Sequence, residues 1–386
     1  MNSFAISRLP VLHFGAGKIS LLMELAKLYG KRVTMVTGGG TIERSPVLQQ
    51  IIDDAKNKGF QLSFQKITCE PSPILVNTAV HELRPVNADV IIAIGGGSVL
   101  DAGKAISAML RADGNVRDYL EGVGTRKHSG EKIPFIAVPT TAGTGSESTK
   151  NAVLSEVGDT GFKRSLRHDN FVPDAVLIDP ELMIPCPPDI TARCGMDAFT
   201  QLLESYVSTN ANPVTDALAL KGLSLVARSL RNAWLDGNDL HARADMAMAA
   251  YFSGITLANA GLGTVHGIAG AFGGFYQISH GHICSALMSP INRRTVENIR
   301  NLKRESIALQ KYARVGRLFS DIQVSETGAI DGLLDTIDAL VNEFGISKIN
   351  HPNLDVVKIA DASDNKSNPV KLTQSEIRES LEEICA

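Results

Sequence analysis

Short apolar runs rich in β-branched residues alternate with amphipathic segments through the first half of the chain. The apolar runs predict strands at 32–37, 61–68, 89–94, 134–138 and 175–178. In segments such as 19–29 and 76–83, apolar residues recur every three or four positions, which predicts helices between the strands. This alternation is typical of a mainly parallel sheet covered by helices, so we expect an α/β fold here.

The sequence changes character after Asp179. A proline-rich break follows at 186–189, and from Ile190 onward helix-forming residues dominate without a convincing strand. We therefore expect an α/β domain at 1–183 followed by an all-helical domain at 184–386.

Composition narrows the class of protein. The 386 residues suffice for two domains that each bury a core. The 38 basic and 41 acidic side chains give a formal net charge of -3, which argues against a nucleic-acid partner. The five cysteines show no CxxC spacing, so we expect a reduced, cytoplasmic setting, and the first residues do not resemble a signal peptide.

One segment, 246–275, contains no Asp, Glu, Lys or Arg and resembles a membrane span in this respect. Polar residues such as Asn259 and Thr264, together with seven glycines, interrupt it. We therefore expect buried helices of a protein core, and no membrane association.

A glycine-rich turn follows the apolar run 91–94. Glycines at a strand-to-helix turn let backbone N–H groups approach an anion closely, and the helix that starts there favours negative charge. A pyrophosphate suits this turn, whose residues are Gly95, Gly96, Gly97 and Ser98. Asp101 and Lys104, three residues apart in the next helix, would both face the ligand; the alternative is a tight turn with a surface ion pair.

A second turn, after the strand at 32–37, bears on cofactor choice. In dinucleotide folds an acidic residue at this kind of position holds the ribose 2′-OH, and small residues with an arginine admit a 2′-phosphate. Here the turn offers Gly38, Gly39, Thr41 and Arg44. NADP(H) is therefore favoured over NAD(H), although a plain loop would have the same composition.

A third turn, 139–147, is rich in hydroxyl groups among glycines. Its candidate cofactor contacts are Thr140, Thr141, Thr144 and Ser146. Hydroxyls and free amides suit a cofactor ribose, amide or phosphate, and a solvent-exposed loop is the alternative.

Five motifs between about residues 10 and 300 together resemble the iron-containing (group III) alcohol dehydrogenase family. They read GGGSVLDAGK from Gly95, PTTAGTGSE from Pro139, FK at Phe162 ahead of two Pro/Asp pairs, GMDAFTQLLESYVS from Gly195, and HGIAGAFGGFYQISHG from His266. The resemblance implies a Rossmann-like dinucleotide-binding domain, a helical metal- and substrate-binding domain, and an active site between them. This is the architecture shared with dehydroquinate synthases.

The resemblance also implies roles for individual residues. The Gly95 turn holds the pyrophosphate, Asp101, Thr140 and Thr141 lie along the cofactor, and Lys163 contacts its ribose. The turn at Gly38 is similar to that of the NADPH-dependent butanol dehydrogenase and aldehyde reductase branch. Relatives often form homodimers through an N-terminal strand similar to segment 4–14.

Members of this family usually bind a divalent metal with one aspartate and three histidines. Asp197, His266 and His280 match three of these positions, and Gln201 stands at the fourth. Asp197 and Gln201 are four apart and share a helix face. A glutamine oxygen is a weaker, neutral ligand, so zinc on three protein residues becomes at least as reasonable an expectation as iron(II).

A second departure is Gly270, where many relatives carry a further histidine. His282 either fills part of that space as a catalytic group, beside His266 and His280, or is a hydrogen-bonded residue at the rim. We expect the cation to act as a Lewis acid while a hydride moves between NAD(P)H and a small alcohol, aldehyde or ketone. The proton donor stays open among His282, a cofactor hydroxyl and water.

Two other functions remain open at this stage. One is a metal-free reductase of the maleylacetate reductase type, in which Gln201 contacts substrate. The other is a lyase of the dehydroquinate synthase type, which needs a Lys, Arg and Asn cluster. Between Asp197 and His280 the chain offers mainly apolar residues plus Arg228, Arg231 and Arg243.

Overall fold

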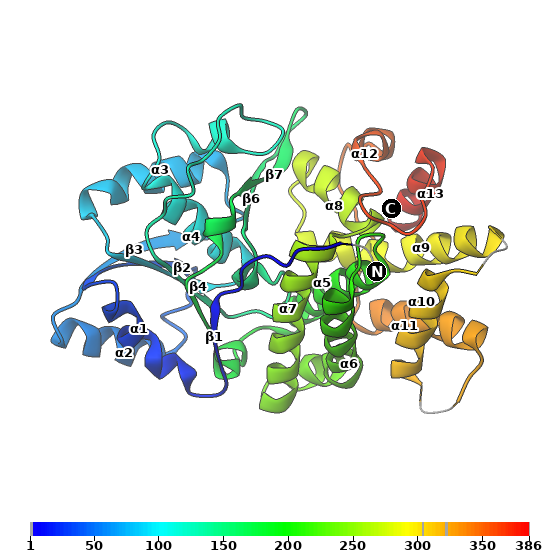
Figure 1. Cartoon of the computed structure of the whole chain (residues 1–386), viewed down its shortest axis with the longest axis horizontal. Coiled ribbons are helices and arrows are strands. Elements are labelled where there is room, and N and C mark those ends of the chain that lie inside the picture. The colour runs from blue at the N-terminus through cyan, green and yellow to red at the C-terminus, as the bar shows by residue number, and fades with distance from the viewer. Residues whose placement is uncertain (1–2, 303–304, 321–322, 386) are drawn as a thin grey trace.

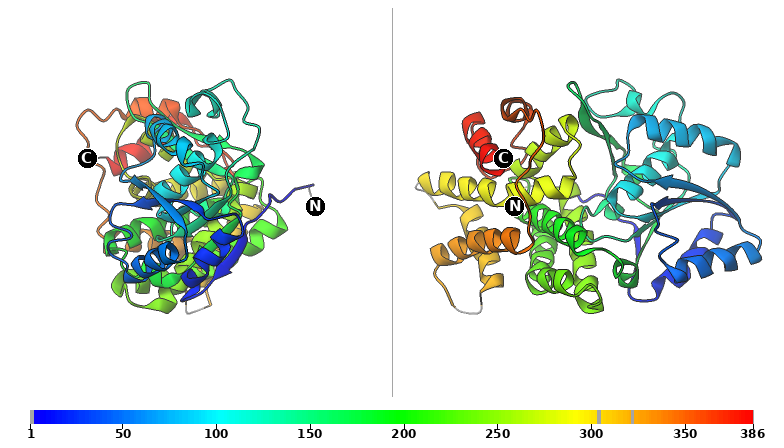
Figure 2. Two further views of the ribbon diagram at one scale, coloured as in Figure 1. Left: turned by 90° about the vertical axis from the view of Figure 1, so that its left-hand side faces the viewer. Right: turned by 180° about the vertical axis from the view of Figure 1, so that it is seen from behind.

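The protein folds into an α/β half and a helical half that lie side by side (Figure 1). The computed structural model describes residues 3–302, 305–320 and 323–385. Figure 2 shows the same two halves from behind and from the side of the α/β half. Within the described residues, no helix is long and apolar enough to cross a membrane.

A six-stranded, fully parallel sheet forms the centre of the α/β half. Its strands, in spatial order, are β1 (Val11–Phe14), β8 (Ala175–Ile178), β5 (Phe135–Pro139), β4 (Val90–Gly95), β2 (Arg32–Gly38) and β3 (Gln61–Ile67). The five predicted strands all occur, within about a residue at each end. The expected α/β fold with a mainly parallel sheet is confirmed.

Helices cover both faces of this sheet. Residues of α1 (Leu22–Lys27) and α2 (Pro46–Asn57) share one apolar core with Ile92 of β4. Residues of α3 (Pro73–Leu83) and α4 (Gly97–Met109) share another with Ile91. Neighbouring residues of a strand point to opposite faces, so the continuous apolar run of β4 is explained by burial on both sides.

An antiparallel hairpin follows the third glycine-rich turn and was not predicted. It consists of β6 (Asn151–Glu156) and β7 (Phe162–Arg167). The strand β7 contains three basic residues and is largely accessible, so its sequence lacks the apolar run by which the other strands were found. The hairpin lies beside the helical half in Figure 1.

The helical half begins at Pro188, after the last strand of the sheet ends at Ile178. Among its described residues, the β contact is a single isolated bridge between Ile349 and Cys385. Its helices are α5 (Pro188–Val207), α6 (Pro213–Leu235), α7 (Leu240–Ala260), α8 (Thr264–Phe275), α9 (His280–Asn301), α10 (Ile307–Gly316), α11 (Glu326–Glu343), α12 (Val356–Ala362) and α13 (Gln374–Ile384). The predicted boundary near 183 falls in the connection between the halves.

Candidate active site

The three glycine-rich turns meet at one edge of the sheet. Strands β2, β4 and β5 are parallel neighbours, so their carboxyl ends lie together. Gly95 pairs in register with Pro139, and the backbone N–H of Thr140 donates to the carbonyl of Gly95 at 3.0 Å. Residues 40 to 100 positions apart in the sequence are thereby brought to one surface.

The turn at Gly95 has no room for larger residues. A Cβ atom at Gly97 would lie 2.6 Å from Oγ1 of Thr144, and one at Gly96 would lie 3.2 Å from Oγ1 of Thr141. Gly96 is the N-cap of α4 and provides no side-chain acceptor for the first-turn N–H groups. These amides, near Ser98, therefore suit an external anion.

Asp101 and Lys104 do not form the surface pair that one reading of the sequence suggested. Lys104 is buried, and its Nζ donates to the carbonyls of Ser146 at 2.8 Å and Asn151 at 2.5 Å. Burial lowers the pKa of Lys104 to about 8. Ser146 Oγ in turn donates to Asp101 Oδ1 at 2.5 Å. Lys104 and Ser146 thus tie the third turn to α4 from within, and the Lys104 ammonium faces protein carbonyls rather than a ligand.

The second turn borders a groove of about 500 Å³. Thr41 and Arg44 line it together with Thr140 and Thr141, and residues of the connection between the halves close its other side. Arg44 Nη2 donates to the carbonyl of Gly39 at 3.0 Å, which holds the guanidinium at the turn.

Lys163, on the hairpin strand β7, lies between the two halves. Its Nζ donates to Oε2 of Glu70 at 2.8 Å. A Cβ atom at Gly273, on α8, would lie 3.1 Å from Cδ of Lys163, so the lysine passes directly over that helix. The absence of a side chain at Gly273 is what lets the lysine approach α8.

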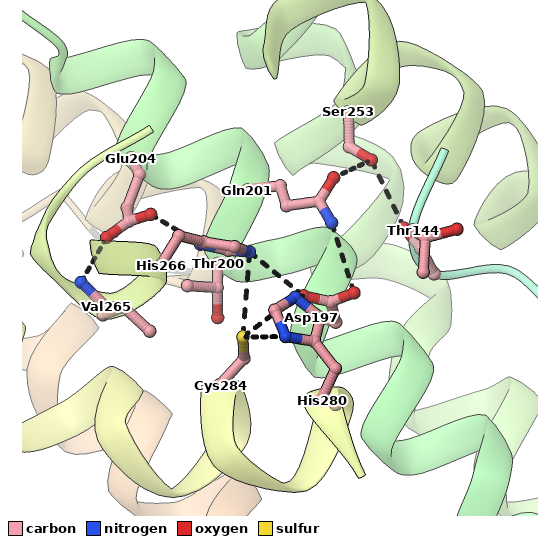
Figure 3. Close-up of polar contacts among 12 residues, drawn as sticks. Thr144, Asp197, Thr200, Gln201, Glu204, Ser253, Val265, His266, His280 and Cys284 are labelled. Atoms are coloured by element: carbon pink, nitrogen blue, oxygen red, sulfur yellow. Dashed lines mark hydrogen bonds and ion pairs between the residues drawn. The ribbon is translucent and has the colours of Figure 1, made fainter. Parts of the chain in front are cut away.

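Side chains from α5, α8 and α9 converge on one buried point of the helical half (Figure 3). Oδ1 of Asp197 lies 3.3 Å from Nε2 of His266 and 3.8 Å from Nε2 of His280. Ligand atoms of Asp197, His266, His280 and Cys284 all lie within 4.8 Å of one another. Two imidazoles, a carboxylate and a thiol at such distances fit a divalent transition metal, whereas magnesium or calcium would favour oxygen ligands.

Gln201 lies beside this group and contacts it through Asp197. Its side-chain nitrogen donates to Oδ2 of Asp197 at 3.2 Å, and its oxygen lies 3.0 Å from Oγ of Ser253 on α7. The carboxylate requires a donor, so the amide nitrogen faces Asp197 and the amide oxygen is turned toward the serine (Figure 3). In this arrangement Gln201 orients Asp197 and leaves Oδ1 to the histidines.

Two further residues of the cluster escaped the sequence analysis as functional groups. Glu204, three residues after Gln201 on α5, is only 3% exposed and accepts a hydrogen bond from Nδ1 of His266 at 2.7 Å. Cys284 is one of the five cysteines, and the sequence assigned a role to none of them. The available signal was spacing, because Cys284 follows His280 by four residues and shares its helix face.

Burial and neighbouring charges perturb the acids and bases of the cluster strongly. Burial lowers the pKa of His280 to about 4 and raises that of Cys284 to about 11. Burial also opposes charge on His266, but Cys284, Glu204 and Asp197 outweigh it and raise the pKa of His266 well above its ordinary value. For Asp197, the burial effect is outweighed by His280 and His266, which lower its pKa. Such opposed shifts in neighbouring groups are typical of functional sites.

His282 does not belong to this cluster, and Gly270 borders open space near it. Nε2 of His282 lies 2.8 Å from the carbonyl of Ser347, and the histidine is not in the group of ligand atoms. It follows His280 by two residues, which places it on another side of α9. Gly270, one turn after His266 on α8, borders open space, since a Cβ atom there would meet nothing within 4 Å.

Comparison with known proteins identifies the family of this chain. The family model "Iron-containing alcohol dehydrogenase" matches residues 10–180, and the model of the C-terminal part of that family matches residues 191–385. The chain belongs to the iron-containing alcohol dehydrogenase family. It is therefore an alcohol oxidoreductase, as the resemblance of its motifs implied.

Individual relatives cover most of the chain. Long-chain-alcohol dehydrogenase 1 of Geobacillus thermodenitrificans is 36% identical over 280 residues, which are 72% of this chain and 70% of the relative. The 1,3-propanediol dehydrogenase of Klebsiella pneumoniae is 30% identical over 382 residues, which are 94% of each. The alcohol dehydrogenase from Oenococcus oeni superposes with a TM-score of 0.88 at 29% identity, covering 99% of this chain and 100% of that one.

Proposed function

We propose that this alcohol oxidoreductase is a metal-dependent aldehyde or ketone reductase that uses NADP(H) in preference to NAD(H). The observation that carries the metal dependence is the convergence of Asp197, His266 and His280 from three helices on one buried point. A carboxylate and two imidazoles suffice for a catalytic zinc and also suit iron(II).

A divalent cation held there would supply Lewis-acid stabilisation of the negative charge that develops on the substrate oxygen. The chain's own residues prepare the site for it. Glu204 accepts a hydrogen bond from Nδ1 of His266 and so directs Nε2 toward Asp197. Gln201 holds the other oxygen of Asp197. The glycine-rich turns at Gly95 and Gly38 would hold the cofactor at the neighbouring sheet edge.

The preference for NADP(H) rests on the turn after β2. Glycines, Gly38 and Gly39, stand where an NAD-binding turn would carry an acidic residue. Thr41 and Arg44 line the adjacent groove. A guanidinium at that point favours a 2′-phosphate, and an acidic residue would exclude it. This assignment agrees with the proposed place in the butanol dehydrogenase and aldehyde reductase branch.

The proton delivered to the substrate oxygen is assigned to water or a cofactor hydroxyl. His282 is a weaker candidate because its Nε2 is already paired with the carbonyl of Ser347. His266 and His280 act as ligands in this scheme.

The decisive experiment measures NADPH consumption with short and aromatic aldehydes by protein that is metal-free, zinc-loaded or iron(II)-loaded. We expect activity only after metal addition, and loss of both metal and turnover in His280→Ala. Full activity in metal-free protein would instead support the maleylacetate reductase type. Carbon–oxygen bond cleavage without net NADPH consumption would support the lyase.

A homodimer formed through the N-terminal segment is part of the proposal. The strand β1 is the edge of the sheet, and Val11 within it is 61% exposed. Exposed edge strands invite pairing with another chain. Light scattering during size-exclusion chromatography tests this: we expect a dimer that Val11→Lys weakens, and a monomeric wild-type protein would contradict it.

A further inference from the structure

We infer that the thiolate of Cys284, on α9, is a fourth protein ligand of the metal, and that the site selects zinc over iron(II). The inference rests on the proposed metal site at Asp197, His266 and His280. It adds a fourth protein ligand whose identity changes the charge and the metal preference of that site.

The distances around Sγ are those of a ligand set. Sγ of Cys284 lies 3.7 Å from Nε2 of His266 and 3.6 Å from Nε2 of His280. In a tetrahedral zinc site, bonds of about 2.0–2.1 Å to nitrogen and about 2.3 Å to sulfur put the ligand atoms about 3.3 to 3.6 Å apart. The nitrogen-to-oxygen distances of 3.3 and 3.8 Å to Asp197 are close to the same values.

The thiol of Cys284 lies between the two imidazoles and is enclosed by the cluster. Sγ is almost equally distant from Nε2 of both imidazoles, and both of these nitrogens are the proposed ligand atoms. The Cys284 residue is 0% exposed, so solvent is not its partner. The sulfur points from α9 into the centre of the cluster (Figure 3).

Helix α5 does not supply the competing fourth ligand. The Gln201 oxygen is turned toward Oγ of Ser253, and its nitrogen, which cannot ligate a cation, is the atom that faces Asp197. The cysteine therefore takes over the position on the opposite side, from α9, one turn after His280.

A thiolate alters the chemistry of the site. Together with Asp197 it gives two anionic ligands, which neutralise a divalent cation, and as a soft ligand it favours zinc over iron(II). Zinc accepts a fifth ligand during catalysis, so four protein ligands leave room for a substrate oxygen. The open space beside Gly270 lies on the His266 face of α8, where that oxygen would approach.

Cobalt(II) is the probe for this inference, because a thiolate ligand gives cobalt an intense charge-transfer absorption in the near ultraviolet that nitrogen and oxygen ligands do not. We expect this absorption in wild-type protein loaded with one equivalent of cobalt, its loss in Cys284→Ser, and its retention in Cys69→Ser, which removes an exposed cysteine. Stoichiometric cobalt binding without the absorption in wild-type protein overturns the inference and leaves the proposed function intact. Failure of wild-type protein to bind cobalt or zinc overturns both.

Metal competition provides the second measurement. The zinc affinity of Cys284→Ser, measured by competition with a chelator, should be lower than that of the wild type by about 10–100-fold or more. Removal of a residue that only hydrogen-bonds to a metal ligand already costs that much. The ratio of zinc to iron(II) affinity, measured without oxygen, should fall as well. An unchanged ratio in a variant that retains the wild-type circular dichroism spectrum contradicts the thiolate ligand.

Discussion

Nδ1 of His266 lies 2.7 Å from Oε2 of Glu204, and both side chains are almost completely buried. The other carboxylate oxygen, Oε1, accepts the backbone N–H of Val265 at 2.7 Å. Glu204 therefore fixes both the ring and the start of the helix that carries it. Because Nδ1 is engaged by Glu204, Nε2 is the nitrogen that faces Asp197 and would ligate the cation.

Replacement of Glu204 tests this positioning role. In Glu204→Ala, His266 loses the acceptor that sets its tautomer, and we expect zinc affinity to fall by about 10–100-fold. Chelator competition measures the change. Glu204→Gln is the matched control, because its amide oxygen still accepts from Nδ1, and it should lose less. Equal zinc affinity in all three proteins would rule out the role.

Cofactor preference is expected to depend on Gly39. A Cβ atom there would lie 3.7 Å from Cγ2 of Thr68, an ordinary contact, so an aspartate fits sterically. In Gly39→Asp, repulsion of the 2′-phosphate should lower kcat/KM for NADPH by about 10–100-fold, while the value for NADH is kept or rises.

The control for this change is Gly39→Ala, which adds volume without charge and should retain the preference for NADPH. Arg44→Ala should lower kcat/KM for NADPH more than for NADH. Steady-state kinetics with both cofactors decide the matter, and a wild-type protein that prefers NADH contradicts the assignment.

Gly270 is expected to set the size of the substrate. Its Cβ would project into open space on the face of α8 that carries His266. In Gly270→Leu, KM for aromatic aldehydes should rise by roughly tenfold, because a few buried carbons change binding by about 1–3 kcal/mol. Metal content should be unchanged. Gly270→Ala is the control with a smaller effect, and equal KM values in all three proteins would show that substrate binds elsewhere.

Lys104 should make the stability of the protein depend on pH. Below about pH 8 its ammonium is protonated in both the folded and the unfolded chain, so the fold bears the full cost of burying it. Above that pH, up to the ordinary lysine value of 10.5, the folded chain loses the proton first. The free energy of unfolding of the wild type, relative to Lys104→Met, should therefore rise across this range.

Urea denaturation at several pH values measures this difference. At neutral pH, Lys104→Met should be less stable by about 1–3 kcal/mol, because the carbonyls of Ser146 and Asn151 lose their donor. If the difference in unfolding free energy between the wild type and Lys104→Met stays constant from about pH 8 to pH 10.5, the lowered pKa of Lys104 is refuted.

Local sequence determined the strands of the main sheet and the glycine-rich turns, and it pointed to candidate residues at the two sites. The run 91–94 is apolar at every position, which is typical of a strand covered on both faces, and the following glycines mark the point where the next helix begins. The hairpin at β6 and β7 was missed because its alternation is weak and half of it faces solvent. Strand prediction depends on a run of buried apolar residues, and in β7 only Leu166 is buried.

What the sequence could not decide is which groups share a point in space. The separation of four between Asp197 and Gln201 placed both on one helix face, but the tertiary structure turned the glutamine oxygen to Ser253 and brought in Cys284, 87 positions from Asp197. Lys104 likewise read as a ligand contact and proved to be an internal anchor. Periodicity fixes the side of a helix on which a residue lies, since that follows from backbone geometry alone. The partner it meets depends on how three helices pack, and that is set by contacts between residues far apart in the chain.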